Sequence, residues 1–237
     1  MSRARRERVG AGLSQKAREI KEVRAPRRFG RIVEGSKIGA VVLAAGQSSR
    51  FRAGGGPDLT KLVAKLDGKA IVQLVVETAL AAKARPIVVV TGYARDSVQA
   101  AVEDLDVGVA FNPKFASGLA SSLSVGLSAM PRDIVGALVL LGDMPRIESR
   151  LIDALIDAFL ARKGALAAVP LREGRRGNPV LLGQGLFEAA MRLEGDEGAR
   201  KLIGALNAND LVEVEASDAG VTFDIDTPED LAAAQRL

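Results

Sequence analysis

The sequence predicts an α/β domain with a mostly parallel sheet and helices on both of its faces. Short apolar runs alternate with segments of helical spacing from Ile38 to the end of the chain. The runs at residues 38–45 and 87–90 are apolar throughout, which is typical of parallel strands buried on both faces. Hydrophobic residues make up 48% of the 237 residues, enough for one large core and too many for a disordered chain.

The expected elements follow one another in a regular order. Strands are expected at residues 38–45, 86–91, 107–111, 137–141, 166–169, 179–182, 212–215 and 222–225. Helices are expected at residues 69–83, 97–105, 119–129, 151–162, 186–193 and 199–206, with a closing helix from Pro228. The short strands between residues 166 and 182 indicate antiparallel pairing near one edge. Because ligands bind beyond the carboxyl ends of parallel strands, we expect the loops after the first four strands to converge on one site.

Charge divides the chain into a tail and a body. Residues 1–37 hold 12 basic and 4 acidic residues, a net charge of +8, whereas the other 200 residues have a net charge of −4. We therefore expect a basic N-terminal tail or linker over residues 1–37, with a short helix over residues 15–23, and a folded domain over residues 38–237. A solvated tail is the plain interpretation. The alternatives are binding to nucleic acid or an anionic surface, or a linker from a larger fused protein.

The composition excludes several classes of site. The chain has no cysteine and no histidine, which removes disulfides, thiolate or imidazole zinc sites, cysteine nucleophiles and Ser-His-Asp triads. A bound metal must therefore have oxygen ligands, which favours Mg²⁺. Aromatic residues are only 3%, so nucleic acid stacked on aromatic side chains is not expected. No apolar run reaches the roughly 18 residues of a membrane span, and the N-terminus lacks a signal-peptide core. We expect a cytoplasmic protein without a membrane partner.

A glycine- and serine-rich loop follows the first expected strand. It extends from Leu43 through Gly46, Ser48 and Arg50 to Lys61, with three glycines at 54–56. Amide groups in such a loop can wrap a triphosphate, and the two basic side chains would neutralise its charge. The loop matches neither the Gly-x-Gly-x-x-Gly nor the Walker pattern, which disfavours dinucleotide dehydrogenases and P-loop hydrolases. A flexible turn with solvated charges is the alternative.

Two aspartates are candidate metal ligands. Asp143 follows the fourth expected strand within a Gly-Asp-Met-Pro motif, at the sheet edge where a ligand of a metal–phosphate complex belongs. Asp226 ends the last expected strand, just before Thr227 and Pro228. Each has a structural alternative, because Asp143 can cap a helix or turn and the residues after Asp226 form a good helix start.

Together these motifs resemble the MobA-like nucleotidyltransferases, and among them the molybdenum cofactor cytidylyltransferases. The resemblance extends from about Ile38 to the C-terminus. It rests on Leu43-Ala44-Ala45-Gly46 with Ser48 and Arg50, Lys61-Leu62, Thr91-Gly92-Tyr93, Asn112-Pro113 with Gly118 and Ser121-Ser122-Leu123, Gly142-Asp143-Met144-Pro145, Arg176-Gly177-Asn178-Pro179-Val180, Gly195-Asp196-Glu197-Gly198-Ala199-Arg200 and Asp224-Ile225-Asp226-Thr227-Pro228. The number and order of these motifs carry the resemblance.

The resemblance implies a Rossmann-like nucleotidyltransferase fold of the nucleotide-diphospho-sugar transferase type. It also implies transfer of a nucleoside monophosphate from an NTP to the phosphate of molybdopterin, with release of pyrophosphate. Arg50, Lys61 and Asp143 are then the expected catalytic residues, and Asp143 and Asp226 the expected Mg²⁺ ligands. The expected nucleotide-binding residues are Leu43, Ala44, Ala45, Gly46, Ser48, Arg50, Lys61, Thr91, Asn112, Gly118 and Ser122. The expected acceptor-binding residues are Asn178, Asp196 and Arg200.

The resemblance also bears on the choice of base and on partners. In this family Leu-Ala-Ala-Gly accompanies CTP, whereas Leu-Ala-Gly-Gly accompanies GTP, so Ala45 points to CTP. A molybdoenzyme or a molybdopterin-binding protein is a candidate partner. The chain departs from the family pattern in its loop, where Arg52 follows Phe51 at a position that is usually glycine. A glycine-rich insert also places Arg50 11 positions before Lys61.

Two other functions stay open at this point. One is nucleotide transfer, from GTP or another NTP, to a different phosphorylated acceptor such as a sugar phosphate. The motif around Asn178 and the turn at residues 195–200 favour the molybdenum cofactor branch. The other is a non-catalytic carrier of molybdenum cofactor, against which the presence of Lys61, Asp143 and Asp226 argues.

Overall fold

The computed structural model describes residues 23–24, 38–56, 60–217 and 219–236. The strands of the main sheet are β1 (Val23–Arg24), β2 (Ile38–Ala44), β5 (Ile87–Thr91), β6 (Gly108–Phe111), β7 (Gly136–Leu141), β8 (Ala167–Arg172), β9 (Arg175–Arg176), β10 (Val180–Gly183) and β11 (Leu211–Glu215). A separate hairpin consists of β3 (Lys65–Leu66) and β4 (Lys69–Ala70). The α-helices are α2 (Ser49–Ala53), α3 (Ile71–Ala81), α4 (Arg95–Ala101), α5 (Leu119–Ser128), α6 (Ser149–Ala161), α7 (Phe187–Ala190), α8 (Ala199–Gly204) and α9 (Pro228–Ala234). The 3-10 turns are η1 (Lys61–Val63), η2 (Phe115–Ser117), η3 (Gln184–Leu186) and η4 (Ala219–Thr222).

The strands are ordered β1-β6-β5-β2-β7-β10-β8-β11 across the described part of the sheet, with β9 paired to β8. β6, β5, β2 and β7 are parallel to one another. β10 is antiparallel to both of its neighbours, and β8 and β11 are parallel. The prediction of a mostly parallel α/β sheet is confirmed, and so is antiparallel pairing between residues 166 and 182.

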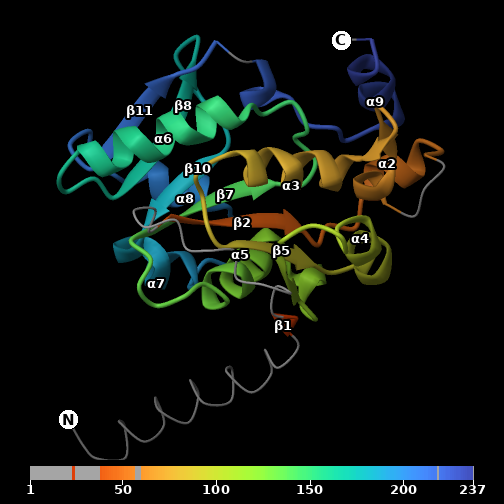
Figure 1. Ribbon diagram of the computed structural model, residues 1–237, viewed down its shortest axis with the longest axis horizontal. Coiled ribbons are helices and arrows are strands. Elements are labelled where there is room, and N and C mark those ends of the chain that lie inside the picture. The colour runs from red at the N-terminus through yellow and green to blue at the C-terminus, as the bar shows by residue number, and fades with distance from the viewer. Residues whose placement is uncertain (1–22, 25–37, 57–59, 218, 237) are drawn as a thin grey trace, which may run out of the picture.

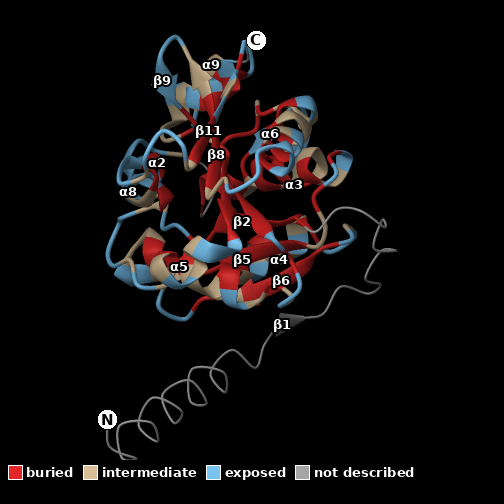
Figure 2. Ribbon diagram, turned by 90° about the vertical axis from the view of Figure 1, so that its left-hand side faces the viewer, coloured by how far each residue is buried: buried red, intermediate tan, exposed pale blue. Residues whose placement is uncertain are grey.

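Helices cover both faces of the sheet, with α3 and α6 on one face and α5 and α7 on the other (Figure 1). Successive residues of β2 point to opposite faces, because Val42 packs in the cluster that contains Ile152 whereas Val41 packs in the cluster that contains Leu123. Both faces of the strand are therefore buried, as its continuous apolar sequence predicts. Figure 2 shows the central strands buried throughout.

The prediction of a strand over residues 222–225 is wrong. The segment begins in η4 and continues without regular structure, and the amide of Ile225 donates to the carbonyl oxygen of Asp143 at 3.0 Å. Ile225 is fully buried in a small cluster with Phe51 and Ala234. Its apolar pattern therefore reflects packing of this segment against α2 and α9 rather than strand pairing.

Other expected elements differ at their ends. α3 begins two residues later than expected because Lys69 and Ala70 pair with Lys65 and Leu66 in the hairpin. α4 ends four residues early at Ala101, and the helix expected over residues 186–193 is η3 followed by the four-residue α7.

The expected tail contributes one described element. β1 pairs antiparallel with β6, with Val23 opposite Ala110 and Arg24 opposite Val109. The helix expected over residues 15–23 lies outside the described residues except for Val23, which belongs to β1. The boundary between a tail and a folded domain at residue 37 stays a prediction.

The topology places a site at the end of two central strands. β5 and β6 lie on one side of β2, and β7 lies on the other, so the direction in which strands are added reverses between β2 and β7. Parallel sheets bind ligands outside the carboxyl ends of the strands at such a reversal. The loops that start there carry Gly46 and Asp143. Among the described helices, none has both the length and the apolar character that crossing a membrane requires.

Candidate active site

The loop after β2 is held in place by one buried side chain and by contacts between its two ends. Phe51 in α2 is fully buried, whereas Gly46, Gln47 and Arg50 around it are exposed. Ser48 adopts a left-handed conformation, with φ of 51°, which turns the chain into α2. The Ser48 hydroxyl hydrogen-bonds the hydroxyl of Thr60 at 2.8 Å. It also accepts from the backbone amide of Lys61 at 3.3 Å. These contacts fix the start of the glycine-rich insert to its end.

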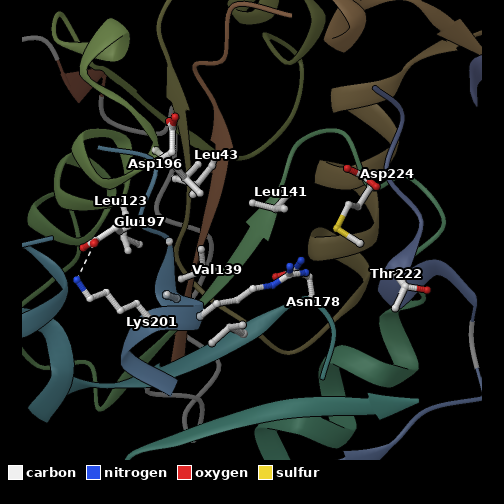
Figure 3. A pocket seen from close by; sticks show the side chains of 16 residues that line it. Leu43, Leu123, Val139, Leu141, Asn178, Asp196, Glu197, Lys201, Thr222 and Asp224 are labelled. Carbon is white, nitrogen blue, oxygen red and sulfur yellow. Dashed lines mark hydrogen bonds and ion pairs between the residues drawn. The ribbon is translucent and has the colours of Figure 1, made fainter. Parts of the chain in front are cut away.

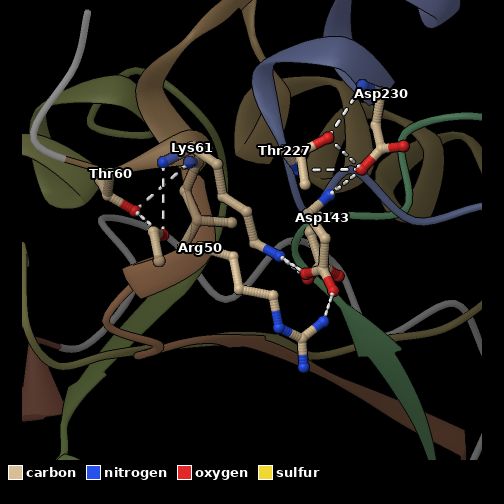
Figure 4. A network of polar contacts seen from close by, with 9 residues as sticks. Arg50, Thr60, Lys61, Asp143, Thr227 and Asp230 are labelled. Carbon is tan, nitrogen blue, oxygen red and sulfur yellow. Dashed lines mark hydrogen bonds and ion pairs between the residues drawn. The ribbon is translucent and has the colours of Figure 1, made fainter. Parts of the chain in front are cut away.

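A cluster of charged side chains lies beyond the carboxyl ends of β2 and β7. The ammonium of Lys61 is 2.7 Å from Asp143 Oδ2 and 2.5 Å from Asp226 Oδ1. Arg50 forms a second ion pair with Asp226. Figure 4 shows the Lys61 and Arg50 side chains pointing to the same group of carboxylates. Residues far apart in the sequence, predicted as catalytic or metal-binding, are thus brought together.

Lys61 is held in its charged form. Its side chain is only 11% exposed, and burial alone would lower the pKa of Lys61. The charges and hydrogen bonds of Asp143 and Asp226 outweigh this effect, and the pKa of Lys61 is raised above its usual value. Lys61 therefore carries a permanent positive charge in the cluster.

Backbone contacts hold both aspartates in place. Asp143 follows β7, and its carbonyl accepts from Ile225. Asp226 precedes a capping box in which the Thr227 hydroxyl accepts from the amide of Asp230 and the Asp230 carboxylate accepts from Thr227. The same carboxylate accepts from the amide of Asp226 at 3.0 Å. The helix start expected around Thr227 is confirmed, and it positions Asp226 rather than competing with it.

A third carboxylate, Asp224, belongs to the same electrostatic environment. Partial burial, followed by the charges of Asp143 and Asp226, raises the pKa of Asp224. Asp224 belongs to one of the motifs that carry the family resemblance, but no role was predicted for it. Two acidic residues two positions apart, Asp224 and Asp226, were the available signal.

The donor set fits a divalent cation supplied together with phosphate oxygens. Asp143 Oδ1 is buried and has no hydrogen-bond partner among the described residues, so an acceptor oxygen with no proton donor is left within the cluster. The described chain contains no group of three or more acidic side chains arranged to hold a metal by themselves. Mg²⁺ is commonly bound through one or two carboxylates together with phosphates and water, which agrees with two carboxylates at this position.

Two cavities adjoin this cluster. The first, of about 590 Å³, is lined by Ala45, Gly46, Gln47, Ser48, Arg50, Lys61, Phe115, Gly118, Ser122, Asp143, Asp196 and Asp226, among others. The second, of about 610 Å³, is lined on one side by Asn178, Thr222 and Asp224 and on the other by Asp196, Glu197 and Lys201 (Figure 3). Asp196 borders both cavities, and Arg200 lines the second. The three residues expected to bind the acceptor, Asn178, Asp196 and Arg200, therefore all line the second cavity, which adjoins the first.

Three residues expected at the nucleotide do not line the first cavity. Ala44 is buried in the sheet, and Thr91 is fully buried, with no hydrogen-bond partner for its hydroxyl in the described part of the chain. Asn112 is 1% exposed; it donates to the hydroxyls of Ser121 and Ser122 and borders a different cavity. Its contact with Ser122, which does line the first cavity, makes Asn112 a support for the cavity wall.

The two cavities share a tightly packed boundary. Gly118 has φ of 102°, and a Cβ at this position would lie 2.2 Å from the backbone of Gly195. The amide of Ala120 donates to the carbonyl of Gly195 at 3.0 Å. Only glycine allows this approach, which joins the start of α5 to the turn that carries Asp196.

Comparison with known proteins identifies the family. Residues 40–211 match the MobA-like NTP transferase domain. The molybdenum cofactor cytidylyltransferase of Escherichia coli K12 is 27% identical over 201 residues, covering 84% of this chain and 96% of that protein. The bifunctional protein GlmU of Neisseria meningitidis is 29% identical over 176 residues; the match covers 74% of this chain but only 37% of GlmU.

Solved structures agree with this assignment. Rv0371c from Mycobacterium tuberculosis H37Rv has a TM-score of 0.73 and 25% identity, covering 85% of this chain and 99% of that one. A second Rv0371c structure, described as a complex with manganese, has a TM-score of 0.67 and 24% identity, covering 84% of this chain and 98% of that one. The matched domain, the sheet topology and the structural likeness over 85% of the chain agree, and the chain belongs to the MobA-like NTP transferase family of nucleotidyltransferases.

Proposed function

We propose that this protein transfers CMP from CTP to the phosphate of molybdopterin or molybdenum cofactor and releases pyrophosphate. The observation that carries the proposal is the pair of adjoining cavities that share Asp196, with the Lys61, Asp143 and Asp226 cluster at the first of them. Transfer between two substrates requires both to be held side by side. Similarity to a molybdenum cofactor cytidylyltransferase over 96% of that protein's length supports this choice of substrates.

In this proposal the first cavity holds the nucleotide. The exposed amides of residues 46–50 surround the triphosphate, and Arg50 and Lys61 stabilise the charge of the departing pyrophosphate. Ala45 limits where the base lies, and Gly118 and Ser122 form the opposite wall. Both cations are already paired with Asp226, so they are oriented before the nucleotide arrives.

The acceptor phosphate supplies its own nucleophile. The second pKa of a phosphate monoester is about 6, so its oxygen is largely ionised at pH 7 and needs no general base. This agrees with a chain that contains no histidine. Asn178, Asp196 and Arg200 orient the acceptor in the second cavity, so that its phosphate approaches the nucleotide in line with the leaving group.

Asp143 and Asp226 are the residues that would hold Mg²⁺. When bound there, the ion neutralises charge on the reacting phosphates. The unpaired, buried Oδ1 of Asp143 supports this assignment, and so does the manganese complex described for the related Rv0371c.

The test is a turnover assay with each NTP in turn and Mg²⁺, in which pyrophosphate release is measured with molybdopterin or, in a parallel reaction, a sugar phosphate as the acceptor. We expect release with CTP that depends on molybdopterin. Release only with a sugar phosphate would favour transfer to another phosphorylated acceptor, and tight cofactor binding without any release would favour a non-catalytic carrier.

A further inference from the structure

Arg52 makes a set of contacts that the function above does not use. Its guanidinium donates through Nη1 to the hydroxyl of Tyr93 at 2.9 Å and lies over the ring of Tyr93, 4.7 Å from the ring centre. Its Nε donates to the carbonyl of Gln47 at 3.2 Å. Arg52 therefore joins α2 both to the loop that precedes it and to the loop after β5.

Tyr93 in turn contacts two segments that line the first cavity. Its amide donates to the carbonyl of Ala45 at 3.2 Å, in the loop after β2. Its ring meets the ring of Phe115 edge to face, with centres 6.2 Å apart, and Phe115 in η2 also lines this cavity. The chain is closely packed at this point, because a Cβ on Gly92 would lie 2.6 Å from Phe115 and 2.7 Å from Ala45.

We propose that Arg52 and Tyr93 form a clasp that fixes the loop after β2 to η2, two segments that line the first cavity, and so pre-positions the loop that would hold the triphosphate. Arg52 is a positioning residue in this account. It does not line the cavity, whereas Arg50, two residues earlier in the same helix, does. The proposal rests on NTP binding in this cavity and is independent of the base and the acceptor.

The physical reason is the cost of ordering a long loop. Residues 46–56 include four exposed glycines or serines and a run of three glycines at 54–56. A loop that must become ordered on binding lowers affinity, and tethering it beforehand recovers that affinity. The buried Phe51 anchors one side of α2, and Arg52 anchors the other to Tyr93.

The experiment measures the dissociation constants of Mg²⁺–CTP and CMP by calorimetry in the full chain. The variants are Arg52→Met, Arg52→Lys, Tyr93→Phe and the double variant Arg52→Met/Tyr93→Phe. We expect Arg52→Met to weaken CTP binding about tenfold and Tyr93→Phe about threefold, as one lost hydrogen bond would. The double variant should equal Arg52→Met, because the hydroxyl has no role once its partner is gone. Lysine cannot reproduce the planar contact, so Arg52→Lys should restore little.

A matched control uses another guanidinium stacked on a ring. Arg95 lies 4.6 Å from the ring centre of Phe111, which does not line the first cavity, so Arg95→Met should leave both constants unchanged. Direct contact between Arg52 and the triphosphate would instead make Tyr93→Phe silent and Arg52→Lys nearly wild type, which overturns the clasp. A lower Tm without any change in affinity overturns it as well. If wild type prefers GTP, the cytidine assignment fails, and the same variants are compared with GTP.

Discussion

Asp143→Asn tests the charged cluster most selectively, because it removes one charge and almost no volume. Asp143 Oδ2 lies 2.7 Å from the ammonium of Lys61. Two unit charges at that separation attract by about 6 kcal/mol at an effective dielectric constant of about 20. We assume that about half of an attraction of this size, about 3 kcal/mol, acts between Asp143 and a cation only in the transition state. Because about 1.4 kcal/mol corresponds to a factor of ten in rate, its loss lowers kcat by about 10²-fold.

The fold should tolerate this change. Lys61 keeps Asp226 at 2.5 Å, and the backbone contact between Asp143 and Ile225 does not involve the side chain. We therefore expect the Tm of Asp143→Asn to stay within a few degrees of wild type. The assay is the initial rate of pyrophosphate release at saturating NTP, with Mg²⁺ raised until the rate is constant. Asp157→Asn, which removes an exposed ion pair with Lys83 outside both cavities, is the control. Wild-type kcat for Asp143→Asn at saturating Mg²⁺ would refute the assignment.

Three further predictions concern the base, the cap and the tail. Ala45→Gly should narrow the preference of kcat/KM for CTP over GTP without reversing it, because one methyl discriminates by only about 1–3 kcal/mol; an unchanged ratio would remove Ala45 from base selection. Burial would raise the pKa of Asp230, but hydrogen bonds from Thr227 and Asp226 outweigh it and lower the pKa. Asp230→Asn should therefore lower the unfolding free energy by about 1 kcal/mol at pH 7, measured by urea titration. This difference between variant and wild type should disappear as pH falls below about 4, because the wild-type carboxylate is then protonated. A constant difference down to pH 2 would contradict this. Removing residues 1–37 deletes only β1 from the described sheet, so turnover should be unchanged and Tm lower by at most a few degrees; an insoluble product, or one without nucleotide affinity, would make this segment part of the fold or site.

The sequence predicts the sheet well where a strand is buried on both faces. β2 and β7 are apolar throughout, β5 is apolar except for its last residue, Thr91, and all three were expected within about one residue of their observed ends. The strand expected around Ile225 is absent for a physical reason. Its apolar residues pack on α2 and α9, a contact that depends on how distant parts of the chain come together.

Those residues of the candidate site that follow the end of a strand could be predicted from the sequence. Asp143 follows from its place at the end of a parallel strand. Asp226 was predicted from its place after a strand expected at residues 222–225, a segment that forms no strand in the structure. The hydrogen bonds of Asn112 hold its side chain on Ser121 and Ser122, outside the lining of the first cavity, which spacing alone cannot indicate. The contact of Arg52 with Tyr93 depends on the course of an unusually long loop, so it became visible only in the structure.

The most direct test of the proposed function follows the nucleotide itself into the product. The protein is incubated with CTP labelled at the α-phosphate, molybdopterin and Mg²⁺, and the molybdopterin product is isolated and analysed by mass spectrometry. The account predicts one labelled CMP added to each molybdopterin, one pyrophosphate released per transfer, and a rate about 10²-fold lower for Asp143→Asn. Unmodified molybdopterin, with the label retained in CTP, would contradict it.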